Sequence, residues 1–432
     1  MMRVVSIVVL VTCICLAPAW SRADDWPQWR GPGRDAISKE TGLLKTWPKA
    51  GPQLAWTYKD AGMGFTAPAV VGGVVYTMGA RGDTEMVIAL DSAGKELWAS
   101  NIGPVFDFKS NTWSRGPDST PTVDGGLLYA LGSQGDLVCL ECKTGKSVWR
   151  KSMPKDFAGE VSNVFGGPDT AKMGWGYAWS PFVDGDKLIC IPGGPEGLFA
   201  ALDKKTGAVL WRSKQATDAA TYASPIWAEI GGVRQYIALV QGGLVGVSAN
   251  DGSVLWQHRR DSDYPDVVCP TPIVHGDFVY ASVGNGGGCD LLKIEKNGDK
   301  FKATPVYNQK QIASRQGGVI LVDGNVYGAH EDRAWVCQDL ATGKTKWESN
   351  RRAVGIGSEV YADGRLYVVG EAKGEVAMFE ASPAGFKQIA KFELPQQSTL
   401  RKPRGKIWTH PVISDGKLYV RDQELIFCYQ IK

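Results

Sequence analysis

The chain lacks the short motifs that mark the common hydrolytic and nucleotide-dependent enzymes. Its 432 residues contain no G-x-S-x-G nucleophile elbow, no H-E-x-x-H pair and no Walker phosphate loop. Histidine is scarce, with four residues in all, so few side chains are suited to acid or base work near neutral pH. These absences leave no motif that points to a hydrolase or a nucleotide-binding enzyme.

Excess charge and long apolar runs are missing as well. A formal net charge of +3 creates no strong field for nucleic acid. The longest apolar run, Val4–Ala17, is shorter than the ~20 residues of a membrane span; it follows Arg3 and precedes Ser21-Arg22-Ala23, as in a secretory signal peptide. We therefore expect residues 1–23 to be removed, Asp24 to begin a mature chain in the periplasm or outside the cell, and neither a nucleic-acid partner nor a transmembrane span.

Cysteine offers neither a full set of disulfides nor a redox pair. Of nine cysteines, seven lie beyond residue 23, an odd number that cannot pair completely. Cys139 and Cys142 form C-x-x-C without the histidine of a haem attachment site. Cys139 and Cys337 share a repeat position with Ala89, which predicts a small buried side chain. The alternative is a lipoprotein signal, in which Cys13, within residues 1–23, would carry the lipid.

Glycine and tryptophan, by contrast, recur together through the chain. Five times a glycine is followed four residues later by tryptophan, as in Gly145/Trp149. A proline followed eight residues later by an aromatic residue or isoleucine precedes most of these pairs, as in Pro121/Tyr129, and Asp-Gly turns lie between them at 123–126 and 183–186. Each repeat holds about four strands, and repeats near 50 residues are typical of propeller blades.

Counting the repeats predicts how the ring closes. Inner hairpins begin near residues 66, 119, 179, 222, 269, 316, 357 and 408, whereas only seven outer strands follow, two of them degenerate at Tyr307 and Phe392. We predict an all-β, eight-bladed β-propeller of four-stranded blades over 54–432, its last blade closed by the N-terminal strand around Trp56, with an extension at 24–53 packing on it. The tryptophans expected to dock one blade on another are Trp56, Trp98, Trp149, Trp211, Trp256 and Trp347.

These repeats resemble the pyrroloquinoline-quinone (PQQ)-like propeller repeats of secreted bacterial proteins, which have the quinoprotein alcohol dehydrogenase-like fold. The resemblance covers residues 54–432, and the segment WPQWRGPGRD at 26–35 is similar to an opening found ahead of the propeller in many such proteins. The family includes quinoprotein alcohol and glucose dehydrogenases and a non-enzymatic lipoprotein of the outer-membrane β-barrel assembly machinery. The resemblance therefore implies a fold more specifically than a function.

For the dehydrogenases, the resemblance implies PQQ on a tryptophan floor, in many members against a disulfide of adjacent cysteines, with Glu, Asn and Asp around calcium and an Asp base. This sequence has no adjacent cysteines, and no such set can be matched residue by residue. Asp261, Asp263 and Asp266 lack the glycine and terminal glutamate of a calcium loop. We therefore predict no metal site and assign no catalytic residue, and PQQ with calcium stays the alternative cofactor.

The loops that join successive blades carry the unusual chemistry of this chain. They should gather on one face around the axial funnel, where arginines and aromatic rings can hold an anionic or planar ligand or a partner peptide. The alternative is that these arginines are solvated and paired with acids such as Asp118 and Asp218. The predicted ligand or partner site consists of Trp113, Arg115, Trp175, Tyr177, Trp179, Arg259, Arg260, Arg315, Arg351, Arg352, Arg404 and Trp408.

The sequence thus predicts an exported, monomeric scaffold that binds an envelope protein or a small ligand at the funnel face, rather than an enzyme. One alternative is a PQQ- and calcium-dependent alcohol or sugar dehydrogenase, in which a tryptophan floor, three oxygen ligands and an aspartate would converge on the axis. A further alternative is an outer-membrane assembly-type factor, whose partner surface would include Arg351 and Arg352.

Overall fold

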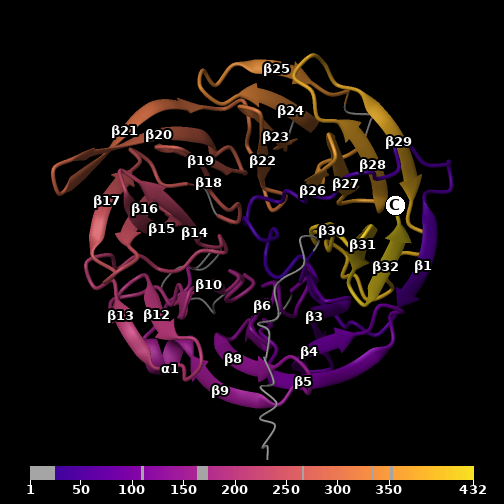
Figure 1. Cartoon of the computed structure of the whole chain (residues 1–432), viewed down its shortest axis with the longest axis horizontal. Helices are drawn as coiled ribbons and strands as arrows, with labels where there is room; N and C mark the ends of the chain where they lie inside the picture. Colours follow the sequence, from indigo (N-terminus) through magenta and orange to yellow (C-terminus); the bar gives the residue numbers. More distant parts are fainter. Residues whose placement is uncertain (1–24, 109–110, 163–173, 265–266, 332–333, 351–353) are drawn as a thin grey trace, which may run out of the picture.

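Eight four-stranded antiparallel sheets surround one axis, each ordered from an inner to an outer strand (Figure 1). The computed structural model describes residues 25–108, 111–162, 174–264, 267–331, 334–350 and 354–432. The predicted eight-bladed, all-β propeller is confirmed.

The first four blades follow one another along the chain, and the single short helix of the described residues, α1 (Met153–Phe157), follows the second blade. Their strands are β2 (Ala69–Val71), β3 (Val74–Arg81), β4 (Thr84–Leu90) and β5 (Glu96–Pro104); β6 (Thr122–Asp124), β7 (Leu127–Leu131), β8 (Asp136–Glu141) and β9 (Ser147–Ser152); β10 (Phe182–Asp184), β11 (Lys187–Cys190), β12 (Ala200–Asp203) and β13 (Val209–Arg212); β14 (Ile226–Ile230), β15 (Val233–Val240), β16 (Gly243–Ser248) and β17 (Val254–Arg259).

The remaining blades complete the ring, and the last one takes its outer strand from the start of the propeller. Their strands are β18 (Ile273–His275), β19 (Phe278–Val283), β20 (Gly288–Asn297) and β21 (Lys300–Gln309); β22 (Val319–Val322), β23 (Asn325–His330), β24 (Ala334–Asp339) and β25 (Thr345–Glu348); β26 (Gly357–Ala362), β27 (Arg365–Gly370), β28 (Glu375–Glu380) and β29 (Gln388–Glu393); and β30 (Val412–Ser414), β31 (Lys417–Asp422), β32 (Leu425–Gln430) and β1 (Gln53–Tyr58).

The closure predicted at Trp56 is confirmed. β1 pairs antiparallel with β32, and Trp56 lies opposite Cys428. In the same register, Trp149 lies opposite Cys139 and Trp347 opposite Cys337. A small side chain is required at this position because a bulky ring occupies the neighbouring strand, and Cys139, Cys337 and Cys428 are all buried, as predicted.

The glycine–tryptophan repeat has a packing explanation. The indole Nε1 of Trp149 donates to the carbonyl oxygen of Lys204 in the next blade at 3.1 Å. A Cβ atom on Gly207 would lie 2.9 Å from the Trp149 ring, and φ at Gly207 is +72°, a conformation that favours glycine. Four of the five glycines thus receive the ring of the preceding blade, since the same packing joins Trp56 to Gly94, Trp98 to Gly145 and Trp211 to Gly252, whereas Gly343 receives the Gln309 side chain.

Two outer strands depart from this pattern. Trp256 donates its indole N–H to Gln235 of its own blade, at 2.7 Å, instead of to the next blade. In the fifth blade Tyr307 stands where the repeat has tryptophan, and its hydroxyl donates to the carbonyl oxygen of Leu340 in the sixth blade at 2.8 Å. A tyrosine therefore keeps the seam contact that the repeat normally makes with indole.

The segment ahead of β1 occupies the centre of the ring (Figure 1). The Arg34 guanidinium, 1% exposed, donates to the carbonyl oxygens of Ser180 and Pro181, at the start of the third blade, and of Pro225, at the start of the fourth, at 2.9 to 3.1 Å. Arg30 donates to the carbonyl of Val319 in the sixth blade at 2.5 Å. We call residues 26–36 the axial plug, because they satisfy backbone groups of several inner strands at once.

Candidate functional site: an aromatic cup on the axis

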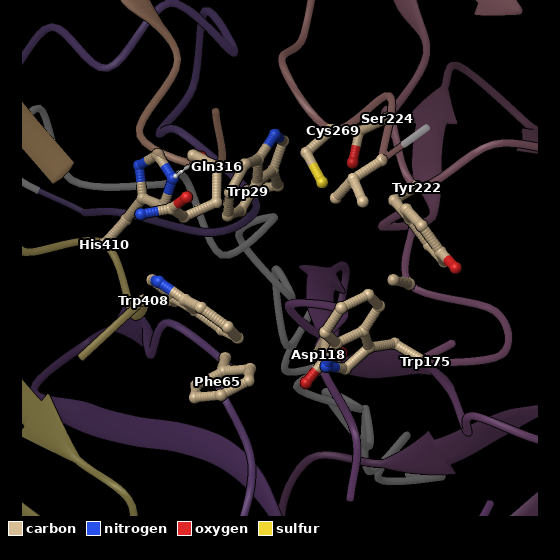
Figure 2. Close-up of a pocket in the computed structure, with 12 residues that line it drawn as sticks. Trp29, Phe65, Asp118, Trp175, Tyr222, Ser224, Cys269, Gln316, Trp408 and His410 are labelled. Atoms are coloured by element: carbon tan, nitrogen blue, oxygen red, sulfur yellow. Dashed lines mark hydrogen bonds between the residues drawn. The ribbon is translucent and has the colours of Figure 1, made fainter. Parts of the chain in front are cut away.

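A cavity of about 110 Å³ lies on the axis, at the face where the loops between blades gather. Seven of the eight loops between blades contribute to it, together with the axial plug. We call it the axial cup, and Figure 2 shows its labelled side chains around the central space. The residues that line it are Trp29, Phe65, Asp118, Trp175, Ala178, Tyr222, Ser224, Val267, Cys269, Gln316, Trp408 and His410.

Four aromatic rings form a continuous wall on one side of the cup. The ring centroids of Phe65 and Trp408 are 4.9 Å apart, those of Trp408 and Trp175 6.0 Å, and those of Trp175 and Tyr222 5.8 Å. The interplanar angles are 60°, 75° and 90°, so the rings meet edge to face, an arrangement that aromatic pairs favour. The wall curves round the space instead of filling it by stacking.

Trp29 of the axial plug also lines the cup. Its indole Nε1 donates to the hydroxyl of Thr271 at 2.8 Å, and its ring packs edge to face against His410 with centroids 4.5 Å apart. These contacts hold the indole of an N-terminal residue among loops more than 240 residues away in the chain. Because the plug supplies this ring, the cup depends on the plug as well as on the blades.

Glu371 fixes the position of Trp408 from the side. Its carboxylate accepts the indole N–H of Trp408 at 3.0 Å, the Gln316 amide at 3.1 Å and the Lys406 ammonium at 3.1 Å. Glu371 is only 7% exposed, so these charge-assisted bonds lie in surroundings where they restrict side-chain motion. Trp408 is therefore held in place before any ligand arrives.

The titratable groups in the wall favour their uncharged forms. Burial lowers the pKa of His410 to about 3, and its Nε2 lies 2.9 Å from the carbonyl oxygen of Gln316. Burial raises the pKa of Cys269 to about 12, so its thiol stays protonated and a poor nucleophile. Burial and the nearby carboxylate of Glu85 hold the pKa of Asp118 well above its usual range.

The structure brings some of the predicted site residues together. Trp175 and Trp408 belong to the wall. Trp113 lies beside it, 5.9 Å from Trp175 between ring centroids, and the Arg404 guanidinium lies 5.5 Å from the Trp113 ring centroid. These four residues form one group at the mouth of the cup.

Two predicted aromatic residues lie away from the cup. Tyr177 is buried, donates its hydroxyl to the carbonyl oxygen of Pro192 at 3.2 Å, and lines a second cavity. Trp179 is fully buried in the core of the third blade. Neither side chain is among those that line the axial cup.

The predicted arginines lie around the funnel face in ion pairs. Arg115 pairs with Asp83 at 3.1 Å, Arg259 with Asp218 at 2.5 Å, Arg260 with Asp290 at 3.2 Å and Arg315 with Glu331 at 2.9 Å. The Arg260 guanidinium also covers the Tyr264 ring at 4.0 Å. Arg351 and Arg352 lie outside the described residues. The ion pairs neutralise much of the positive charge on which an anion site would depend.

Phe65, Asp118, Tyr222, Cys269, Gln316 and His410 were missed as site residues, although a signal for most of them exists. In six blades a proline, such as Pro68 or Pro411, marks the entry of the inner strand. The residue three positions earlier points into the cup in six repeats, where the pairs are Phe65/Pro68, Asp118/Pro121, Ala178/Pro181, Tyr222/Pro225, Cys269/Pro272 and Trp408/Pro411. Gln316 stands at the same distance before Val319, which takes the place of the proline.

The donor set of the cup does not match the calcium and PQQ site that the resemblance implied. Three tryptophans line the cup, but Asp118 is its only carboxylate among the described residues. Among the described residues, no group of three or more His, Cys, Asp or Glu side chains could hold a metal ion. The seven cysteines in this part of the chain are all free. Calcium needs about six to eight oxygen ligands, so we derive no chemistry through this cofactor.

Fold and site together define a β-propeller with an aromatic binding cup on its axis. The sequence model of the family described as "Outer membrane protein assembly factor BamB" matches residues 83–349, more than half of the chain. The chain therefore belongs to this PQQ-like propeller family.

Individual relatives agree with this assignment at low identity. An outer membrane protein assembly factor BamB of Burkholderia pseudomallei is 24% identical over 307 residues, which cover 65% of this chain and 76% of that protein. The dehydrogenase subunit of a quinone alcohol dehydrogenase from Gluconobacter oxydans is 29% identical over 282 residues, covering 58% of this chain but only 31% of the subunit. This chain thus matches less than a third of that dehydrogenase.

A solved structure is similar over nearly the whole fold. The quinohemoprotein alcohol dehydrogenase of Comamonas testosteroni superposes with a TM-score of 0.61 at 13% identity, covering 96% of this chain and 81% of the other. At this identity the likeness concerns the fold alone. Within the described residues, no helix has the length and apolar character needed to span a membrane.

Proposed function

We propose that the protein is an exported binding scaffold of the cell envelope, which holds a partner protein or a ligand through the axial cup. One observation carries the proposal: seven loops between blades and the axial plug converge on a single aromatic cavity. Aromatic residues that line a concave site are typical of binding hot spots. The relatives described as outer membrane assembly factors support a protein partner in the envelope.

The absence of a suitable set of reactive groups in the cup also favours binding over catalysis. The thiol of Cys269 and the imidazole of His410 are both held in neutral forms. Asp118 has no second carboxylate beside it in the cup wall with which to share acid and base roles. A PQQ-dependent dehydrogenase therefore remains the alternative function.

The proposal is tested by capture from envelope extracts with matched baits. We expect wild-type protein to retain a defined set of partners and the double variant Trp175→Ala, Trp408→Ala to lose them. Leu97→Ala, on the exposed outer strand β5, is the control, because Leu97 is 52% exposed and lies far from the cup wall. Identical captured sets for all three baits would contradict the proposal, and stoichiometric, calcium-dependent binding of PQQ to the wild type would favour the dehydrogenase.

A further inference from the structure

We propose that the axial cup binds a positively charged ammonium group. This group belongs either to a small alkylammonium solute or to a lysine side chain of a partner. This inference rests on the proposed function, because it names the chemistry of the same site. It differs from the anionic ligand that the rim arginines suggested.

The shape of the cup suits a compact cation. Phe65, Trp408, Trp175 and Tyr222 form the curved wall, and Trp29 is a fifth ring. Figure 2 shows the four wall rings round the central space, with Asp118 between Phe65 and Trp175 in this view. The faces of aromatic rings carry negative electrostatic potential, and cages of such rings bind quaternary and alkylated ammonium groups.

The sign of the charge inside the cup supports the same conclusion. Among the described residues that line the cup, Asp118 is the only acid, and none is a lysine or an arginine. The nearest cation behind Asp118 is Arg421, 1% exposed, whose guanidinium already donates to Gly62, Thr66, Thr77, Met78 and Gln423. A positively charged ligand would therefore find one carboxylate in the wall. The Arg30 guanidinium lies behind His410 rather than in the wall, and it donates to the carbonyl oxygens of Val319 and Asp35.

Several arginines of the rim are paired with acids, whereas Arg404 lies over the Trp113 ring at the mouth of the cup. Arg259 pairs with Asp218, and Arg315 pairs with Glu331. Arg401 forms an ion pair with the buried carboxylate of Asp422. Since exposed ion pairs leave little net field, Asp118 and Arg404 set the electrostatic preference of the site, and Asp118 is the one of the two that lines the cavity.

Binding of a cation in the cup should release a proton from Asp118. The groups that act on Asp118 are the carboxylate of Glu85, which raises its pKa, and Arg421 and the Phe65 amide, which lower it; desolvation outweighs them and keeps the pKa well above the usual range. The Cys269 thiol and the His410 imidazole nearby stay neutral. An ammonium in the cup stabilises the carboxylate form. Affinity for the cation should thus rise with pH, by up to about tenfold per pH unit.

The test compares choline with 3,3-dimethyl-1-butanol, which has the same shape without the charge, by calorimetric titration of the full exported protein. We expect choline to bind about tenfold more tightly than the neutral alcohol. We also expect its affinity to rise with pH while that of the alcohol stays constant. Asp118→Asn should remove both the preference and the pH dependence, and Trp175→Ala should weaken binding of both compounds.

The wild-type measurements alone can decide the matter if Asp118→Asn fails to fold. Equal or tighter binding of the neutral alcohol would overturn the cation assignment and leave the proposed binding function standing. Binding of neither compound would also overturn it. If, in addition, Trp175→Ala and Trp408→Ala left partner capture unchanged, the proposed function would fail too.

A second experiment distinguishes a lysine of a partner from a free alkylammonium solute as the source of the ammonium group. A short peptide with one lysine is titrated beside the same peptide with acetyl-lysine, which lacks the charge. Choline is then added to captured envelope partners. Release of the partners by choline, with the lysine peptide bound in preference to its acetylated form, indicates a partner lysine; binding of choline alone indicates a free alkylammonium solute.

Discussion

Tryptophans of the outer seams and tryptophans of the axis serve different purposes in this propeller. In the seams, Trp98 and Trp149 each donate an indole N–H to a carbonyl of the next blade and pack against a glycine there. On the axis, Trp175 and Trp408 lie on the loops between blades, and their rings line the cavity. Seam tryptophans join the ring together, whereas axial tryptophans leave a space open.

The difference lies in what surrounds each ring. A seam indole is enclosed by the next copy of the same repeat, so its environment recurs around the ring. The axial rings meet one another in a series of edge-to-face contacts that does not recur from blade to blade, and the plug residue Trp29 lines the same cavity. Stability is therefore spread over the seams, and binding is concentrated at the axis.

The largest effect is expected from the axial plug. Arg34→Ala would leave the carbonyl oxygens of Ser180, Pro181 and Pro225 without their buried donor. We expect it to lower the free energy of unfolding by about 3–5 kcal/mol, measured by denaturant titration. Arg404→Ala, at an exposed position, is the control and should change stability by less than about 1 kcal/mol. A small effect of Arg34→Ala would mean that the plug is not needed to hold the inner strands.

Glu85, a buried acid at the contact between the first and second blades, should make the stability of the protein depend on pH. Burial raises the pKa of Glu85 to about 7 from 4.5, and its carboxylate accepts hydrogen bonds from the backbone N–H and hydroxyl of Ser133 in the next blade. Its contribution to stability is complete below about pH 4.5 and is lost as the pH rises through about 7, by up to about 3 kcal/mol.

Glu85→Gln isolates this contribution. The variant keeps the shape of the side chain without its titration, so the difference in unfolding free energy between wild type and variant should change in favour of the wild type as the pH falls from 7 to 4.5. A difference that stayed constant over this range would show that Glu85 is ionised in the folded protein.

Exchanging tryptophan for alanine tests the comparison itself. Trp149→Ala should cost about 2–3 kcal/mol of stability and leave cup binding unchanged. Trp175→Ala should cost about 1 kcal/mol or less, because its ring lines the open cup instead of joining two blades, and it should weaken binding. Thermal unfolding and titration are measured on both variants. If both lost stability and binding together, the division between seam and axis would be wrong.

The smallest difference is expected between two glycine variants, one in the repeat and one in a hairpin turn. Gly207→Ala adds a methyl group 2.9 Å from the Trp149 ring, whereas Gly185→Ala, at a similar φ of +60°, meets nothing within 4 Å. Both carry the backbone cost of about 1 kcal/mol, and Gly207→Ala should cost about 1 kcal/mol more through overpacking. Equal losses would show that the seam can move to accept the methyl group.

Much of the ring could be predicted from the sequence because its contacts recur. The count of inner hairpins predicted eight blades, and the missing last outer strand predicted closure by Trp56. The outer strands without tryptophan could also be predicted, because Tyr307 and Phe392 take the place of the tryptophan in β21 and β29. Periodicity makes several weak signals add up.

The axis was harder to predict because each of its contacts occurs once. Arg34 bonds to carbonyls 146 to 191 residues away, and no local pattern encodes such pairs. The predicted site was chosen largely for its arginines in the loops. The cup is instead lined by residues such as Phe65, Asp118 and Tyr222, each three positions before a proline that marks an inner strand. The predicted roles of the site residues stay predictions until binding is measured.

The most direct test of the axial cup is fluorine NMR of the protein labelled with 5-fluorotryptophan, with signals assigned by single substitutions and titrated with choline and with 3,3-dimethyl-1-butanol. The account predicts that the signals of Trp29, Trp175 and Trp408 shift while those of Trp98, Trp149 and Trp347 do not. Shifts confined to the seam tryptophans, or no shift with either compound, would contradict it.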